Sequence, residues 1–301
     1  MFIPLKDNLP RSGFPLITAL LIALNCFVFI VASSDPVENV EVTSQYGVVA
    51  YELTHAGKQC VSTLQETICG SDAQMRAKYP GLDFPPTSLT VLTSMFLHAD
   101  WMHLIGNMLF LLVFGMALEL ALGRFVFASF YLIGGAAAVL LQTVWEMNSQ
   151  LPMVGASGAI SALLAGYLVL FPRAKVISLV FGFFPARVAA YWVIGTWLVT
   201  QLLMAWFGAA AGETGGVAVF AHLGGFAIGL PLTYLLMSRE TIADCRQQAR
   251  LAGIPKIDPN GRFFTSEQQR AQYFGVPPGQ PRPYAPQGQW VDPTKPRFIK
   301  P

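Results

Sequence analysis

Charged side chains are scarce in this chain of 301 residues. Only 12% of the residues are Asp, Glu, Lys or Arg, whereas 53% are hydrophobic and the mean hydropathy is +0.49. A soluble domain carries roughly twice that charged fraction, so the composition excludes an ordinary soluble protein. The net charge of +2 indicates little by itself, and we expect a lipid bilayer around the chain and no nucleic-acid partner.

Cysteine is also rare. Cys26 lies in the first apolar run and Cys245 in the C-terminal tail, whereas Cys60 and Cys69 lie close together in a long loop. A disulfide between Cys60 and Cys69 fits if the loop faces an oxidising compartment, and two free thiols fit about equally well. We expect no metal and no cofactor.

The sequence shows no cleavable signal peptide. The first apolar run, Pro15 to Ala32, is long for the core of a signal peptide, and no Ala-x-Ala exit follows it. We therefore interpret this run as a membrane anchor that is retained. A bacterial inner membrane fits the lack of a transit peptide.

Six apolar runs are candidates for membrane spans, each of which needs about 20 residues. They cover residues 15–32, 103–122, 125–145, 157–171, 188–207 and 217–237. The sequence therefore predicts an all-α polytopic membrane protein whose six-helix domain covers residues 15–240, with an outer loop at 33–97. Residues 1–14 precede it, and the tail 241–301 begins basic and becomes proline-rich, which is typical of disorder.

Basic residues mark one side of this predicted bundle. They occur before the first span, between spans two and three, between spans four and five, and after span six: Lys6, Arg11, Arg124, Arg173, Lys175, Arg187 and Arg239. The loop 33–97 on the other side holds seven acids against three bases. The positive-inside rule therefore predicts that both termini are cytoplasmic.

Three polar residues inside the spans lie at one predicted depth. Asn107 precedes Arg124 by 17 residues, Ser157 precedes Arg173 by 16, and His222 precedes Arg239 by 17. At about 1.5 Å per residue, all three lie about 24–26 Å from the inner boundary, near the outer edge of a ~30 Å hydrocarbon core. Polar residues at such depth are candidates for function.

This layer could perform nucleophilic catalysis. A serine beside a histidine forms a nucleophile and its general base. No carboxylate lies at the same depth, so Ser157 and His222 would form a dyad. Asn107, His103 and the Ser157 amide would donate to an oxyanion, and the loop from Leu151 to Ala156, which includes Gly155, would line a polar cavity.

Small residues predict close packing of spans four and six. Gly158, Ala162 and Gly166 recur at four-residue steps in span four, and Gly225 and Gly229 do so in span six. Such spacing lets helix axes approach closely. The packing would bring Ser157 and His222 together.

These motifs resemble the rhomboid family of intramembrane serine proteases, of the six-span type. The matching pieces are His98-x4-His103-x3-Asn107, Glu119-x3-Gly123-Arg124, Gly155-x-Ser157-Gly158 and His222-x2-Gly225-x3-Gly229. The resemblance covers residues 1 to about 240. It implies that Ser157 is the nucleophile, that His222 is the base, and that His103 and Asn107 bind the oxyanion. It further implies that the fifth span and the Gly208–Gly216 loop form a gate and cap.

The chain departs from the family at one point. Many members carry a Trp-Arg pair before the first histidine, where this chain has Leu89 and Thr90, which leaves the anchoring of the outer loop open. We interpret His98 as a histidine that packs the loop and Glu119 as a structural hydrogen-bonding residue.

Two other function classes compete with peptide-bond hydrolysis in single-span membrane substrates. A catalytically silent rhomboid-like binder of membrane proteins would be expected to lack the serine or the histidine, and both are present. A transporter would show repeated halves with broken helices, which the sequence does not show. We therefore expect an intramembrane serine endopeptidase.

Overall fold

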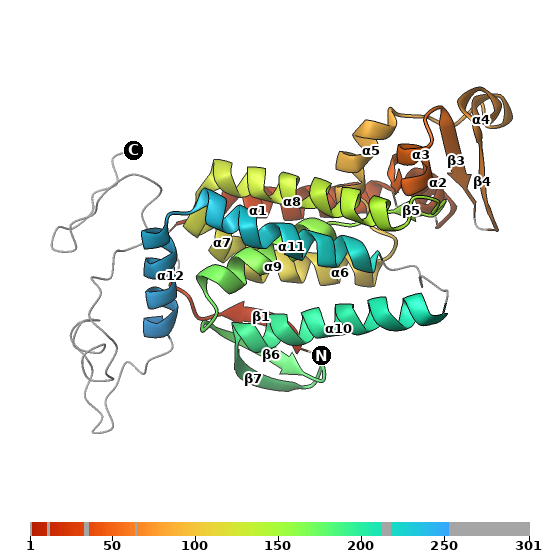
Figure 1. Cartoon of the computed structure of the whole chain (residues 1–301). Coiled ribbons are helices and arrows are strands. Elements are labelled where there is room, and N and C mark those ends of the chain that lie inside the picture. The colour runs from red at the N-terminus through yellow and green to blue at the C-terminus, as the bar shows by residue number, and fades with distance from the viewer. Residues whose placement is uncertain (1, 11–12, 33–35, 64, 212–217, 253–301) are drawn as a thin grey trace, which may run out of the picture.

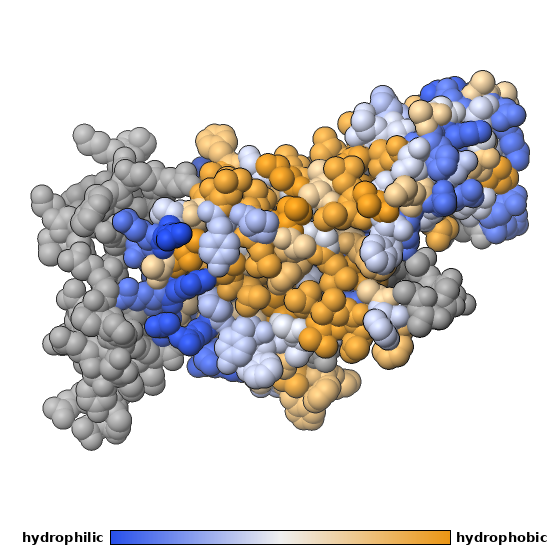
Figure 2. All heavy atoms as spheres, in the orientation of Figure 1, coloured by the Kyte–Doolittle hydropathy of each residue, from blue (hydrophilic) through white to orange (hydrophobic). Residues whose placement is uncertain are grey.

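The computed structural model describes residues 2–10, 13–32, 36–63, 65–211 and 218–252. Figure 1 shows a bundle of long helices running side by side, with a smaller outer region at one end and helix α12 crossing the other end. In Figure 2, apolar surface forms a belt over the long helices, between two hydrophilic ends. The chain is mostly helical, and the apolar belt is that of a multi-pass membrane protein.

An apolar helix lies at each of the six predicted spans. The helices are α1 (Leu16–Ala32), α6 (Trp101–Phe110), α8 (Arg124–Trp145), α9 (Ser157–Leu170), α10 (Ala190–Ala211) and α11 (Val219–Leu236). Helix α6 continues through a π-helical turn, η2 (Leu111–Gly115), into α7 (Met116–Leu122). In the described residues, four helices are long and apolar enough to span a membrane, whereas α1 and α9 are shorter, with 17 and 14 residues.

Helix α9 is the centre of the bundle. All its residues are buried except Ser157 and Leu168. Glycines of α11 lie directly against it: a Cβ on Gly225 would strike the Gly158 carbonyl, and one on Gly229 would strike the Ala162 backbone. Helices α9 and α11 therefore pack backbone to backbone, as their small residues predict.

A buried carboxylate attaches α1 to this core. Glu119 of α7 is 2% exposed and accepts hydrogen bonds from the backbone N–H groups of Ile17 and Thr18 and from the Thr18 hydroxyl, at 2.7–2.9 Å. The carboxylate thus satisfies N–H groups that the first turn of a helix leaves free. The interpretation of Glu119 as a structural residue is confirmed.

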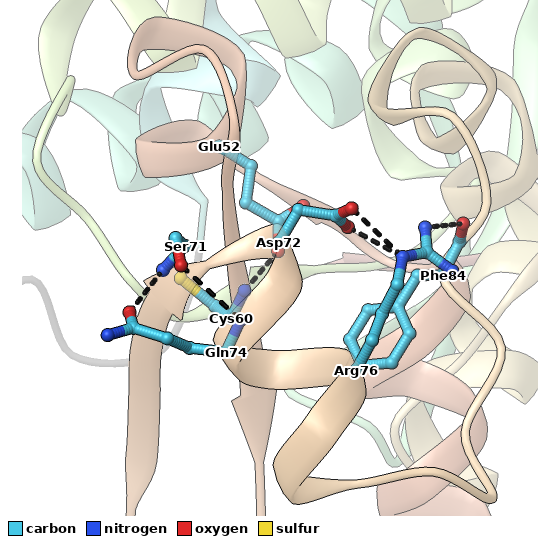
Figure 3. Close-up of polar contacts among 7 residues, drawn as sticks. All are labelled: Glu52, Cys60, Ser71, Asp72, Gln74, Arg76 and Phe84. Carbon is cyan, nitrogen blue, oxygen red and sulfur yellow. Dashed lines mark hydrogen bonds and ion pairs between the residues drawn. The ribbon is translucent and has the colours of Figure 1, made fainter.

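The outer region is a small folded unit. It contains α2 (Pro36–Tyr46), β2 (Val48–Val49), α3 (Ala50–Thr54), β3 (Lys58–Ser62), β4 (Thr67–Ser71), α4 (Asp72–Lys78), α5 (Thr87–Thr93) and the 3-10 turn η1 (Ser94–Phe96). A disulfide between Cys60 and Cys69 joins β3 to β4. Around this hairpin, Figure 3 shows the Glu52 carboxylate accepting from the Cys60 N–H at 2.6 Å and Arg76 bound to Asp72 at 2.9 Å.

Backbone pairing anchors the outer region where the Trp-Arg pair is missing. Strand β2 pairs with β5 (Pro152–Met153), and the Tyr51 N–H donates to the Ser149 carbonyl at 2.9 Å. Leu89 is exposed, and the Thr90 hydroxyl donates to the Thr87 carbonyl in its own helix. The loop before α9 is therefore fixed to the outer region by its own backbone.

The described residues contain seven strands, which corrects the all-α prediction, and three of these strands form a sheet beside the bundle. Strands β1 (Phe2–Asp7), β6 (Lys175–Val180) and β7 (Phe184–Ala189) form an antiparallel sheet in the order β1-β6-β7. Residues 188–189, which we predicted to begin the fifth span, belong to β7, and α10 begins at Ala190. Apolar and polar residues do not alternate in β6 and β7 as they do in a half-buried strand. The two strands therefore could not be distinguished from the neighbouring span by their sequence pattern.

The start of the tail forms helix α12 (Arg239–Ala252). Ile242, Cys245 and Ala249 are buried, and the Arg246 Nε–H donates to the Val169 carbonyl near the end of α9, at 2.8 Å. The basic start of the tail is thus a helix that packs across one end of the bundle. The proline-rich part of the tail and most of the Gly208–Gly216 loop lie outside the described residues.

Candidate active site

Ser157 and His222 are in direct contact. Ser157 is the first residue of α9, His222 lies in the first turn of α11, and the Ser157 Oγ lies 2.8 Å from the His222 Nε2. The contact follows from the packing of the two helices, because the Gly225 backbone touches Gly158 one residue after the serine. A hydroxyl hydrogen-bonded to an imidazole is the arrangement that general-base activation requires.

Gln201 on α10 holds the other side of the imidazole. Its Oε1 lies 2.8 Å from the His222 Nδ1, and the side chain is 7% exposed. A carboxamide oxygen can only accept, so it selects the tautomer in which Nδ1 carries the proton. The His222 Nε2 then has a free lone pair to accept the Ser157 hydroxyl proton.

Gly155, His103 and Asn107 meet beside the serine. Gly155 has φ +124°, and a Cβ there would lie 2.7 Å from the His103 Nε2 and 3.6 Å from the Asn107 Nδ2. Glycine is thus required both by its backbone angle and by the close approach of the His103 ring. Asn107 is 8% exposed, and its Nδ2 has no hydrogen-bond partner among the described residues.

An unpaired buried donor is uncommon because it loses its hydrogen bond to water. The Asn107 amide lines the same cavity as Ser157, so a substrate oxygen could occupy the free position. The start of α6 is held by Asp100, whose Oδ1 accepts from the His103 N–H at 2.9 Å. The donors are therefore carried on a capped helix.

His98 supports this group from behind. It is 1% exposed, and its ring lies edge-on to the His103 ring with 5.1 Å between centroids. Burial, followed by the neighbouring His103, lowers the pKa of His98 to about 3, so the ring is neutral at physiological pH. The expectation of a packing histidine fits this position.

A cavity of about 530 Å³ contains the site. Its lining includes the side chains of Ser157, His222, His103 and Asn107, together with residues 151–154 of the loop before α9 and Trp197 of α10. The loop belongs to the end of the bundle that carries the outer region (Figure 1). The lining is mostly apolar, but its polar groups can bind water or backbone, which lets irregular backbone exist at membrane depth.

Two buried glutamines near the site were not predicted from the sequence. Gln201 holds His222, and Gln142 of α8 accepts from the Ala221 N–H at 2.8 Å through its Oε1, which fixes the backbone one residue before His222. Both lie inside predicted spans, so the rule that picked out the other intramembrane polar residues would have found them. No group of His, Cys, Asp and Glu suited to a metal occurs in the described part of the chain.

The fold and site thus define a polytopic membrane protein with a serine–histidine pair in a cavity that also contains buried polar side chains. The rhomboid domain family matches residues 86–239, slightly more than half of the chain, and includes every residue of this site. The chain belongs to the rhomboid family.

Individual relatives are similar over the same part of the chain. "Rhomboid protein 1, mitochondrial" of Saccharomyces cerevisiae is 31% identical over 153 residues, which cover 49% of this chain and 42% of the yeast protein. An uncharacterised protein of Mycobacterium tuberculosis is 34% identical over 167 residues, 54% of this chain and 65% of its own length. RHOMBOID-like protein 4 of Arabidopsis thaliana is 31% identical over 153 residues, 50% of this chain and 34% of the plant protein. The chain therefore matches less than two thirds of each of these relatives.

Proposed function

We propose that this protein is an intramembrane serine endopeptidase that hydrolyses a peptide bond of a membrane-spanning substrate. The observation that supports this most directly is the hydrogen bond between Ser157 and His222, with Gln201 selecting the basic tautomer of the histidine. A serine used only for helix packing would have no need of an oriented base.

In the proposed reaction, the Ser157 Oγ attacks the substrate carbonyl carbon while its proton passes to the His222 Nε2. The negative charge on the carbonyl oxygen is stabilised by the Asn107 Nδ2–H, by His103 and by the Ser157 amide. The imidazolium then gives its proton to the departing amine, and the C–N bond breaks to leave an acyl-enzyme. Water deprotonated by His222 cleaves this ester and restores the serine.

The membrane arrangement of the proposal has six spans and cytoplasmic termini. Helices α1 and α9 join the four longer spans because both are apolar and packed in the same bundle. Basic residues at the α12 end support a cytoplasmic position for that end, because the positive-inside rule favours it. The cavity then opens near the outer face, where a single-span substrate would present unwound backbone, and a bacterial inner membrane would suit this topology.

The test is labelling and cleavage in proteoliposomes. A fluorophosphonate probe should label the wild-type protein at Ser157, and Ser157→Ala and His222→Ala should each abolish labelling and cleavage of a model single-span substrate. Thr200→Ala is the matched control, because this hydroxyl is exposed on α10 and bonds only to its own helix at Thr196. Labelling or cleavage that persists in Ser157→Ala would overturn the proposal, as would a folded wild-type protein that binds substrates without cutting them.

A further inference from the structure

The sheet β1-β6-β7 has one charged end and one apolar end. Its four charged side chains share the rows farthest from the β6–β7 turn: Lys6, Asp7, Lys175 and Arg187. Lys6 and Arg187 both lie opposite Ile177. From the row of Ser178 to the turn, the three strands carry no charged side chain. A sheet that lay wholly in water would not require such a gradient.

The apolar end exposes three aromatic rings. Phe181, Phe183 and Phe184 are 75%, 81% and 68% exposed. Contiguous exposed apolar side chains are uncommon on surfaces that face water and mark a contact with an apolar partner. We call residues 181–184 the phenylalanine tip.

The backbone conformation of the phenylalanine tip does not favour a phenylalanine at position 181. Phe181 has φ +51° and Gly182 has φ +82°, the angles of a type I′ hairpin turn, in which Asn or Gly is favoured at the first central position. A bulky residue with positive φ is a conformational outlier. The turn itself therefore gives no reason for a phenylalanine at 181, whereas a contact made by its ring would.

The sheet lies beside a membrane-spanning helix. Figure 1 shows β6 and β7 alongside the first half of α10, the helix whose residues Ala190–Gly208 form a candidate span. In Figure 2, the lower edge of the belt, where the hairpin lies in Figure 1, shows apolar atoms toward the middle of the belt and weakly polar to charged atoms toward the α12 end. Phe181 is four residues beyond the charged row at Ile177, which is about 13 Å at roughly 3.3 Å per residue.

We propose that the phenylalanine tip is inserted into the acyl chains of the leaflet at the α12 end of the bundle, with phospholipid hydrocarbon as its partner. The distance of about 13 Å is close to the thickness of one leaflet in a ~30 Å hydrocarbon core. Lys175 and Arg187 then lie at headgroup level, where basic residues are favoured. This proposal does not depend on the catalytic function proposed above.

The edges of the sheet are compatible with this environment. Unpaired backbone donors are unfavourable in lipid, and the two edge strands carry Pro4 and Pro185, which have no N–H. Both prolines lie beyond the charged row, in the part of the sheet assigned to the acyl chains. The prolines thus remove a donor from each edge of the sheet at the predicted depth.

The experiment measures the surroundings of a spin label in proteoliposomes. The two cysteines outside the disulfide are replaced first (Cys26→Ser, Cys245→Ser), and the Cys60–Cys69 disulfide stays oxidised. A label is then attached to Phe183→Cys, to Leu202→Cys on the exposed face of α10, and to Lys58→Cys in the outer region. Collisions with molecular oxygen, which dissolves in lipid, and with a water-soluble nickel chelate are compared at the three sites.

We expect the ratio of oxygen to nickel collisions at position 183 to match that at 202 and to exceed that at 58 several-fold. A label at 183 that behaves like the one at 58 would place the tip in water and overturn the proposal. Shielding from both reagents would also overturn it, because protein rather than lipid would then cover the tip. Phe183 is largely exposed, so its replacement should leave the thermal midpoint of the cysteine-replaced background unchanged, and that midpoint checks the fold.

Discussion

Helices α9 and α10 both contribute to the site, but they are held in opposite ways. Helix α9 is buried along almost its whole length, and its backbone touches α11. In α10, Gln201 is the one buried residue between Gly195 and Gly208. Ser157, the proposed nucleophile, is thus fixed by packing, whereas Gln201, which binds His222, comes from a helix that mostly faces outward.

This difference suggests how the site could combine precision with access. Preorganised donors are effective because they need no rearrangement during the reaction, and Ser157 and the proposed oxyanion donors lie on packed helices. In the proposed function, however, a substrate helix enters from the bilayer. Movement of α10 would open the cavity near Trp197 and would at the same time release His222 from Gln201.

The largest effect should come from a residue of the site that lies on a packed helix. Asn107→Ala removes a buried donor that has no partner in the described structure and that would act only on the oxyanion. We expect the catalytic rate to fall about 10²- to 10³-fold, as for other oxyanion donors, with little change in substrate affinity. Single-turnover cleavage in proteoliposomes separates the two. An unchanged rate with weaker affinity would show that Asn107 binds substrate instead.

The next effect tests the packing itself. In Gly229→Ala the new Cβ would lie 2.7 Å from the Ala162 Cα, and we expect a loss of about 1–3 kcal/mol of stability through overpacking. Gly195→Ala on α10 is the matched control, because no atom lies within 4 Å of its Cβ position. It should be neutral or slightly stabilising, since alanine is the better helix former. Thermal unfolding in detergent measures both, and equal midpoints would contradict the proposed contrast between the two helices.

A smaller effect should come from the α10 side. Gln201→Leu removes the acceptor for the His222 Nδ1–H, and we expect about a tenfold lower rate of labelling and cleavage, the equivalent of one ordinary hydrogen bond. Gln201→Glu keeps an acceptor oxygen and should recover part of the rate. Thermal midpoints should change little, because the neighbouring residues on this face of α10, such as Trp197 and Leu198, are only partly buried. If the leucine and glutamate variants were equally slow, Gln201 would be a packing residue.

Much of the part of the site that lies on packed helices could be predicted from the sequence. The spacing from Asn107, Ser157 and His222 to the arginines at the predicted inner ends of their spans gives one depth, and the structure brings these residues to one cavity. Glycines at four-residue steps gave the contact between α9 and α11 because backbone packing in a membrane helix depends on local sequence.

The α10 side was harder to predict. Strand β1 could not be predicted because it pairs with a segment far away in the chain, Phe2 with Val180. No local sequence pattern indicates such a contact. Gln201 was not predicted for a different reason. It is a polar residue inside a predicted span, but its role depends on its contact with His222 of another helix. The attachment of the outer region could not be predicted because it depends on pairing between β2 and β5.

The outer region provides a third kind of attachment, and its strength should depend on pH. Glu52 is 8% exposed beside the Cys60–Cys69 hairpin (Figure 3), and burial raises the pKa of its carboxyl from 4.5 to about 7, although the Cys60 N–H opposes the shift. The folded protein therefore keeps a proton that the unfolded chain releases above about pH 4.5. Stability must then fall as the pH rises from 4.5 through 7, because the native state binds more protons.

Glu52→Gln should remove this dependence, since an amide does not titrate. We expect the variant and the wild-type protein to unfold at similar temperatures at pH 5, and the variant to unfold at a higher temperature at pH 8. Limited proteolysis after Lys58 or Arg76, both in the outer region, shows whether this region is the part that loosens. The matched control is Glu66→Gln, an exposed carboxylate on the same hairpin, for which no such separation between pH 5 and pH 8 is expected. Parallel curves for wild type and Glu52→Gln across this range would show that Glu52 does not couple the outer region to pH.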